Sequence, residues 1–137
     1  MDSTSTQVNV QRIDATTFEE LVQKPENLDR NLELVAGEII EMVSNQRSSV
    51  IALRIGYLLT TYVLQDNLGF LTGMDGGFAF GNERYIPDIA YVPFERQAEP
   101  TTEAYAQTPP ALVVEVLSPA NHKQPGVMRK KLHTYFR

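Results

Sequence analysis

The chain of 137 residues contains no cysteine and no tryptophan. The absence of cysteine excludes disulfide scaffolds, zinc sites built from thiolates and cysteine nucleophiles. No uninterrupted apolar run approaches the roughly 18 residues of a membrane-spanning helix, and residues 1–11 are too polar for a signal peptide. Hydrophobic residues still make up 42% of the chain, which is enough for a buried core. We therefore expect a soluble cytoplasmic protein without a membrane partner.

Acidic residues outnumber basic ones by 17 to 12, so the net charge does not favour general electrostatic binding of nucleic acid. The distribution is uneven, however, because residues 116–137 carry five basic residues and no acid. This basic segment is either a solvated helix face or a local contact for phosphate. The length fits one domain, and we expect a disordered polar N-terminus over residues 1–12 and a single domain over 13–137.

The first half of the chain predicts two helices and a hairpin. Thr16-x-x-Glu19 and Thr17-x-x-Glu20 are capping boxes, so a helix should begin there and end before Pro25. Residues 32–43 predict a β-hairpin with Gly37 in its turn. Residues 48–65 predict a long helix that ends at Gly69. Its apolar face should comprise Ile51, Ile55, Leu58, Leu59 and Tyr62.

The second half predicts strands and a last helix. Strand-like residues cover 70–72, 78–80 and 85–92, and a polar loop follows over 93–110. The apolar run 111–117 is typical of a central strand that is covered on both faces. A helix should run from Pro125 to the end of the chain. This order predicts an α/β or α+β fold, in which a central sheet is flanked by helices.

Glu115 is the most informative residue, because it interrupts the apolar run 111–117. An ionised, unpaired carboxylate buried in such a strand costs several kcal/mol. Glu115 must therefore pair with a base, take up a proton, bind a metal or lie at an open end of the sheet. An exposed strand face is the alternative, although Val113 and Leu117 on the same face are also apolar.

Asp88 is the second informative residue, because Pro87-Asp88 interrupts the strand-like segment 85–92. A proline in a strand belongs at an edge, a strand start or a bulge, and bulges often re-aim side chains at active sites. A simple Pro-Asp turn is the alternative. Asp88 and Glu115 on neighbouring strands, with a base nearby, would form a site that suits Mg²⁺ or Mn²⁺.

Four short motifs follow one another along the chain. They are Glu33-Leu34-x-x-Gly37-Glu38-Ile39, Pro87-Asp88-Ile89, Val113-Val114-Glu115-Val116-Leu117-Ser118-Pro119 and Lys131-x-x-x-Tyr135. In this order and spacing they resemble the Uma-type family of bacterial restriction-endonuclease-like proteins, within the PD-(D/E)XK nuclease superfamily. The resemblance covers about residues 15–137.

The resemblance implies a restriction-endonuclease-like fold, a mixed sheet flanked by helices, and a divalent-metal phosphodiesterase site that acts on DNA. Asp88 and Glu115 match the family's metal-binding acids, and the carbonyl of Val116 is a further candidate ligand. Glu33 matches an additional acid of the site, and Glu38 is a further candidate. The implied cofactor is Mg²⁺ or Mn²⁺.

The superfamily's usual lysine, two residues after the second acid, is replaced here by Leu117. Lys131 is the candidate for a lysine that has moved to the following helix, and Lys130 is the second choice. Both lysines would otherwise be solvated side chains of that helix. Because Lys131 precedes Tyr135 by four residues, the two side chains should share one helix face.

Three functional interpretations stay open. The first is a metal-dependent DNA endonuclease that uses Glu33, Asp88, Glu115 and Lys131. The second is a non-catalytic nuclease-fold module that binds nucleic acid or protein. The third is a truncated, inactive paralogue, because the family pattern continues beyond residue 137 into another core strand. An uncovered helix face or open sheet edge also predicts a homo-oligomer, most simply a dimer.

Overall fold

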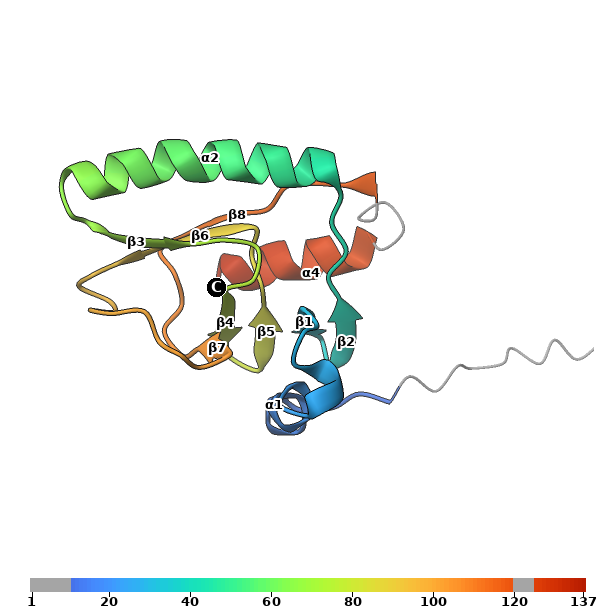
Figure 1. Cartoon of the computed structure of the whole chain (residues 1–137). Helices are drawn as coiled ribbons and strands as arrows, with labels where there is room; N and C mark the ends of the chain where they lie inside the picture. The colour runs from blue at the N-terminus through green and yellow to red at the C-terminus, as the bar shows by residue number, and fades with distance from the viewer. Residues whose placement is uncertain (1–10, 120–124) are drawn as a thin grey trace, which may run out of the picture.

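The computed structural model describes residues 11–119 and 125–137 (Figure 1). Most of the predicted disordered N-terminus, residues 1–10, therefore lies outside the described residues. In chain order the elements are α1 (Ala15–Val22), a 3₁₀ turn (Pro25–Asn27), β1 (Leu32–Val35), β2 (Glu38–Glu41), α2 (Gln46–Gln65), β3 (Gly69–Thr72), β4 (Gly77–Phe80), β5 (Glu83–Tyr85), β6 (Ile89–Pro93), β7 (Tyr105–Ala106), β8 (Leu112–Val114) and α4 (Pro125–Tyr135).

The strands form two sheets. The larger has the order β2-β1-β5-β4-β7, and it is mixed because β7 pairs with β4 in parallel while its other pairs are antiparallel. The smaller is antiparallel and has the order β3-β6-β8. In Figure 1, α2 runs above the smaller sheet, α4 lies below it, and α1 lies beside the hairpin β1–β2. The predicted mixed sheet flanked by helices is therefore confirmed.

Side chains explain the first helix and the hairpin. Helix α1 begins at Ala15, earlier than the capping boxes suggested, because Asp14 is the N-cap and its carboxylate accepts a hydrogen bond from the Thr17 N–H at 2.8 Å. The helix ends before Pro25, as predicted. The hairpin is confirmed, with Ala36 and Gly37 both at positive φ in its turn.

Helix α2 begins at Gln46, because the Asn45 side chain accepts a hydrogen bond from the Ser48 N–H at 2.9 Å. The prediction that Gly69 ends this helix is wrong. Asn67 takes the positive φ after the helix, and Gly69 lies in β3. A methyl group on Gly69 would overlap the carbonyl oxygen of Val92 in the paired strand β6, so close approach of two backbones requires glycine there.

The buried face of α2 also differs from the prediction. Ser48, Ala52 and Val63 are its buried residues, and Gly56 lies against the side chain of Ile89. These small residues let the helix lie close to the smaller sheet. As a consequence, three of the five predicted face residues are exposed; these are Ile51, Leu58 and Tyr62.

The strand predicted over residues 85–92 divides in two. Strand β5 ends at Tyr85, Pro87-Asp88 forms the connection, and β6 begins at Ile89 in the other sheet. The run 111–117 is not a central strand, because β8 is short and lies at the edge of the smaller sheet. Strand β8 ends at Val114. Beyond it, the Val116 N–H donates its hydrogen bond to the Asp88 carboxylate and not to a neighbouring strand.

Two clusters of buried side chains hold the layers together. One joins α1 to the larger sheet, with Phe18, Leu32 and Leu34 at its centre. The other joins the two sheets, with Phe78 from β4 packed near Ala90 and Val92 from β6. Within residues 11–119 and 125–137, no helix combines the length and the apolarity needed to cross a bilayer.

The close approach at Gly69 gives a first prediction. Gly69→Ala should destabilise the protein by about 1–3 kcal/mol, because the new methyl group forces β3 away from β6. Gly73→Ala is the matched control, since a Cβ at Gly73 meets no atom within 4 Å. Urea denaturation of both variants measures the difference. Equal denaturation midpoints for the two variants would show that the β3–β6 contact does not require glycine.

Candidate active site

Asp88 and Glu115 lie next to each other at one end of the smaller sheet. Asp88 directly precedes β6 and Glu115 directly follows β8, and the last residue pair of these antiparallel strands is Ile89 with Val114. The two acids are therefore the next pair beyond the ladder. The backbone N–H of Val116 donates a hydrogen bond to Asp88 Oδ2 at 2.5 Å, which fixes the carboxylate. The sequence predicted the two acids on neighbouring strands; the structure brings them together just beyond the ends of the neighbouring strands β6 and β8.

Lys131 joins these acids to the hairpin. Its ammonium nitrogen, on α4, lies 2.6 Å from Glu115 Oε1 and 2.9 Å from Glu33 Oε2. The side chains of Lys131 and Glu33 are each only 1% exposed. A buried ammonium group between two carboxylates has its charge compensated, which a solvated helix lysine would not need. The structure thus brings Glu33, Asp88, Glu115 and Lys131 together.

Glu33 is the deepest acid of this cluster. It lies in β1, where all four residues are buried, and its Oε2 also accepts a hydrogen bond from the Ile86 N–H at 2.6 Å. The Ile86 contact lies just before Pro87-Asp88, so Glu33 also holds the connection that carries Asp88. Glu38, at the start of β2, does not line the cleft described below.

Two tyrosines complete the cluster, and sequence reasoning assigned neither of them a role. The Tyr135 hydroxyl donates a hydrogen bond to Glu115 Oε1 at 2.7 Å, one helical turn after Lys131. The ring of Tyr85 lies 5.4 Å from the Lys131 nitrogen and packs edge-on against Tyr135. The spacing Lys131-x-x-x-Tyr135 was the available signal for Tyr135, because it places both side chains over the same target.

Burial and neighbouring charges set the protonation of the site. Burial raises the pKa of Asp88, and the nearby charge of Glu115 raises it further. Burial also raises the pKa of Glu33, although Lys131 opposes this. Burial alone would lower the pKa of Lys131, but the charges of Glu33 and Glu115 outweigh it, so the pKa is raised. Lys131 is therefore a cation near neutral pH, suited to stabilising negative charge and unsuited to acting as a base.

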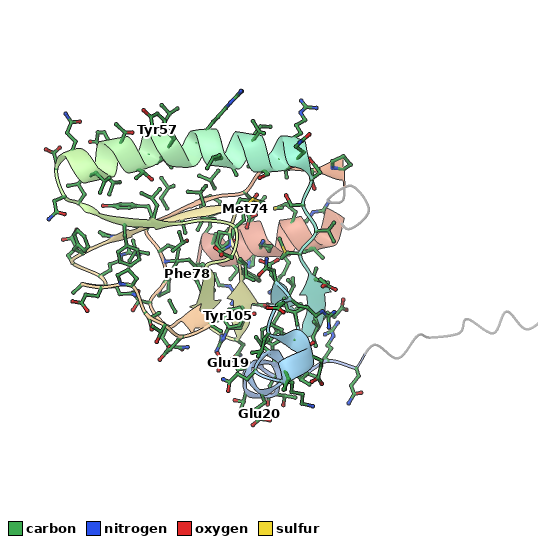
Figure 2. All side chains as sticks on the ribbon, viewed as in Figure 1. Glu19, Glu20, Tyr57, Met74, Phe78 and Tyr105 are labelled. Carbon is green, nitrogen blue, oxygen red and sulfur yellow. The ribbon has the colours of Figure 1, made fainter. Side chains whose placement is uncertain are left out.

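The cluster opens onto a cleft of about 670 Å³. The chain between β2 and α2 and the first turn of α2 form one wall, and α4 forms another. Met74 lies between α2 and α4 in Figure 2 and also lines the cleft. The lining includes the four charged residues of the cluster, Glu33, Asp88, Glu115 and Lys131.

The donor set fits a hard divalent cation that keeps several other ligands. Among the described residues, Asp88 Oδ1 and Glu115 Oε2 accept no hydrogen bond, while the second oxygen of each carboxylate is occupied. Within that part of the chain, no group of three or more acidic or histidine side chains is arranged to hold a metal. Two carboxylates suffice for Mg²⁺, which commonly takes its other ligands from water and substrate phosphate.

Of the other residues that the sequence analysis named, Val116 lines the cleft and Lys130 does not. Val116 lines the cleft, but the contact shown is that of its N–H with Asp88, so a role for its carbonyl stays a prediction. Leu117, at the superfamily's usual lysine position, is 68% exposed. Lys130 does not line the cleft; its ammonium group lies 3.7 Å from Glu83, in an ion pair that is partly exposed. The structure therefore favours Lys131 over Lys130.

The raised pKa of Asp88 predicts a stabilising substitution. Above the pKa of the unfolded chain, ionising this carboxyl costs more in the folded state, so the fold loses stability as pH rises through the folded pKa. Asp88→Asn removes this cost and can still accept the hydrogen bond from Val116. We expect the Tm of Asp88→Asn to exceed that of the wild type by a few degrees at pH 7–8, roughly 3–5 °C per kcal/mol.

The difference should disappear below about pH 3, where Asp88 is protonated in both states. Thermal unfolding of the two proteins across this pH range is the measurement. A variant that is less stable than the wild type at pH 7–8 would contradict a raised pKa of Asp88 in the folded protein.

The buried ammonium group predicts a large cost for its removal. Lys131→Ala should destabilise by about 3–5 kcal/mol, because it leaves Glu33 and Glu115 buried without their partner. Lys130→Ala, at the adjacent surface position, should cost at most about 1 kcal/mol. Chemical denaturation of both variants tests this contrast. Similar losses would mean that Lys131 does not compensate buried charge.

Comparison with known proteins places this cluster in context. The sequence profile of the Uma2 family, described as "Putative restriction endonuclease", matches residues 18–137. A search of curated proteins finds no match. Among solved structures, the chain is similar to a crystal structure described as a "putative nuclease belonging to DUF820" from Anabaena variabilis ATCC 29413.

That structure superposes with a TM-score of 0.70 at 20% sequence identity, over 89% of this chain and 67% of the other. At this identity the similarity establishes the fold, and the predicted nuclease-like architecture is confirmed. The profile match covers most of the chain, including all four charged residues of the cluster. The chain therefore belongs to the Uma2 family.

Proposed function

We propose that this protein hydrolyses phosphodiester bonds of DNA as an endonuclease that depends on Mg²⁺ or Mn²⁺. The observation that carries the proposal is the pair Asp88 and Glu115, side by side in an open cleft, each with one free oxygen and beside a buried ammonium group. Membership of a family described as restriction-endonuclease-like supports a nucleic-acid substrate.

Asp88 and Glu115 would hold the divalent ion through their free oxygens. Bound there, the ion would polarise the scissile phosphate and lower the pKa of a bound water molecule. The hydrogen bonds from Val116 and Tyr135 fix the second oxygen of each carboxylate, so both acids are oriented before the ion arrives.

Lys131 would orient the attacking water and offset the negative charge that develops on the phosphate. Its raised pKa keeps it charged for that role. Glu33 would act through Lys131, because it accepts hydrogen bonds from the ammonium group at 2.9 and 3.2 Å and holds it at the edge of the cleft. Lys131 from α4 would thus supply the positive charge that Leu117, at the superfamily's usual lysine position, cannot supply.

The experiment compares the wild type with Asp88→Asn, because this variant is expected to be more stable and loss of activity cannot be ascribed to unfolding. Calorimetric titration with Mn²⁺ measures binding, and incubation with plasmid DNA and Mn²⁺ measures cleavage. Changes to residues that merely hold a metal ligand cost about 10–100-fold in affinity, so loss of a ligand should cost at least that much. Asp29→Asn, an exposed acid away from the cleft, is the control and should behave as the wild type.

The outcomes separate the functional alternatives. Cleavage that survives in Asp88→Asn would show that this cluster is not the nuclease site. Metal binding without cleavage by the wild type would favour a non-catalytic module that binds nucleic acid or protein. Absence of metal binding would leave Asp88 and Glu115 as structural acids and remove the basis of the proposal.

A further inference from the structure

The outer face of α2 is strongly apolar. Seven large apolar side chains on this helix are between 37% and 75% exposed. Figure 2 shows Tyr57 projecting from the side of α2 that faces away from the smaller sheet. Soluble monomers rarely expose contiguous apolar patches of more than a few hundred Å². We call this set the outer face; it comprises Val50, Ile51, Leu53, Tyr57, Leu58, Tyr62 and Leu64.

The rest of the protein does not account for this face. The opposite side of α2 already packs on the smaller sheet through Ser48, Ala52 and Val63. The helix contains no acidic residue, and Arg47 and Arg54 are its only charged side chains. Neither arginine forms an ion pair within the described part of the chain. A helix that is apolar on both sides is normally buried on both sides.

The spacing of the outer face favours another helix as its occupant. Val50, Leu53, Tyr57, Thr60 and Leu64 recur at alternating intervals of three and four residues. This is the pattern of a seam along which two helices interlock. Ile51, Leu58 and Tyr62 form a separate stripe on the flank of the helix, more than a third of a turn around from the seam, and Arg54 lies between the two stripes.

The area of the seam reaches the lower limit for a dimer interface. With side chains of about 200 Å² each and exposed fractions of 41% to 75%, the four large apolar residues of the seam offer on the order of 500 Å² per copy; these are Val50, Leu53, Tyr57 and Leu64. Two copies would therefore bury about 1,000 Å² in total, which is the lower limit for a specific protein interface. A second copy of the same helix satisfies both the spacing and the area with one self-complementary contact.

We propose that two copies of this chain associate through the outer faces of their α2 helices, packed antiparallel with Tyr57 near the two-fold axis. A parallel arrangement would place Arg54 opposite Arg54 of the other copy. In the antiparallel arrangement Val50 lies opposite Leu64, and Arg54 can stack on the Tyr57 ring of its partner.

This arrangement would fix the positions of the two clefts. The first turn of α2 lines the cleft, so each cleft lies at the N-terminal end of its helix. Antiparallel packing therefore places the two clefts at opposite ends of the helix pair. The helix has 20 residues, so the clefts would be separated by about 30 Å along its axis.

Sedimentation velocity at tens of micromolar tests the proposal without requiring nuclease activity or metal binding. The wild type should sediment with twice the chain mass of 15.4 kDa, and Leu53→Asp should sediment as a monomer. Leu28→Asp is the matched control, because Leu28 is 67% exposed but lies outside α2, and it should remain a dimer. A monomeric wild type, or equal dissociation of both variants, would overturn the proposal.

Cross-linking provides a second test that does not depend on disrupting the face. Because the chain has no cysteine, single-cysteine variants report one contact each. A mixture of Val50→Cys and Leu64→Cys should form a mixed disulfide dimer, and neither variant alone should cross-link efficiently. Efficient cross-linking of each variant with itself would indicate parallel helices and contradict the antiparallel assignment.

Discussion

The ammonium group of Lys131 lies 2.6 Å from Glu115 and 2.9 Å from Glu33, and with these contacts α4 joins the hairpin β1–β2 to the end of β8. Removing an ion pair of this kind from water costs several kcal/mol for each ion, and mutual attraction only partly repays the cost. Replacing a buried ion pair with well-packed apolar residues of similar size is often neutral or stabilising. We infer that the cluster serves to hold charged groups at the edge of the cleft, as the proposed function requires.

The crowding of charged groups in this cluster also affects the protonation of Asp88. Its pKa is raised by burial and by Glu115, yet its carboxylate is fixed by the backbone of Val116, and one oxygen stays free. Two neighbouring carboxylates repel each other when both are ionised, and a divalent cation between them would relieve that repulsion. Opposition between stability and function is common in active sites, and here it arises from the register of β6 with β8.

Much of this arrangement follows from sequence. The hairpin was predicted from Gly37, and the meeting of Asp88 with Glu115 from two acids that interrupt apolar strands. The assignment of strands to sheets could not be predicted, because local periodicity does not encode the pairing of distant strands. Residues 85–92 divide between two sheets, and β8 is an edge strand.

The prediction of the buried face of α2 was wrong for a similar reason. Large apolar residues predicted one face, whereas close packing on the sheet selected Ser48, Ala52 and Gly56. Tyr135 and Glu33 contact the other site residues through tertiary packing. In the sequence, only the order of the four motifs indicated that these residues belong to one site.

The central claim is that Asp88 and Glu115 together hold a divalent ion beside Lys131. Anomalous diffraction from crystals soaked in Mn²⁺ tests it most directly, because it locates the metal without relying on catalysis. The account predicts one strong anomalous peak in the cleft, in contact with Asp88 Oδ1 and Glu115 Oε2, with the Lys131 ammonium group close by. A peak bound to other residues, or a cleft without a peak in crystals that bind Mn²⁺ elsewhere, would contradict it.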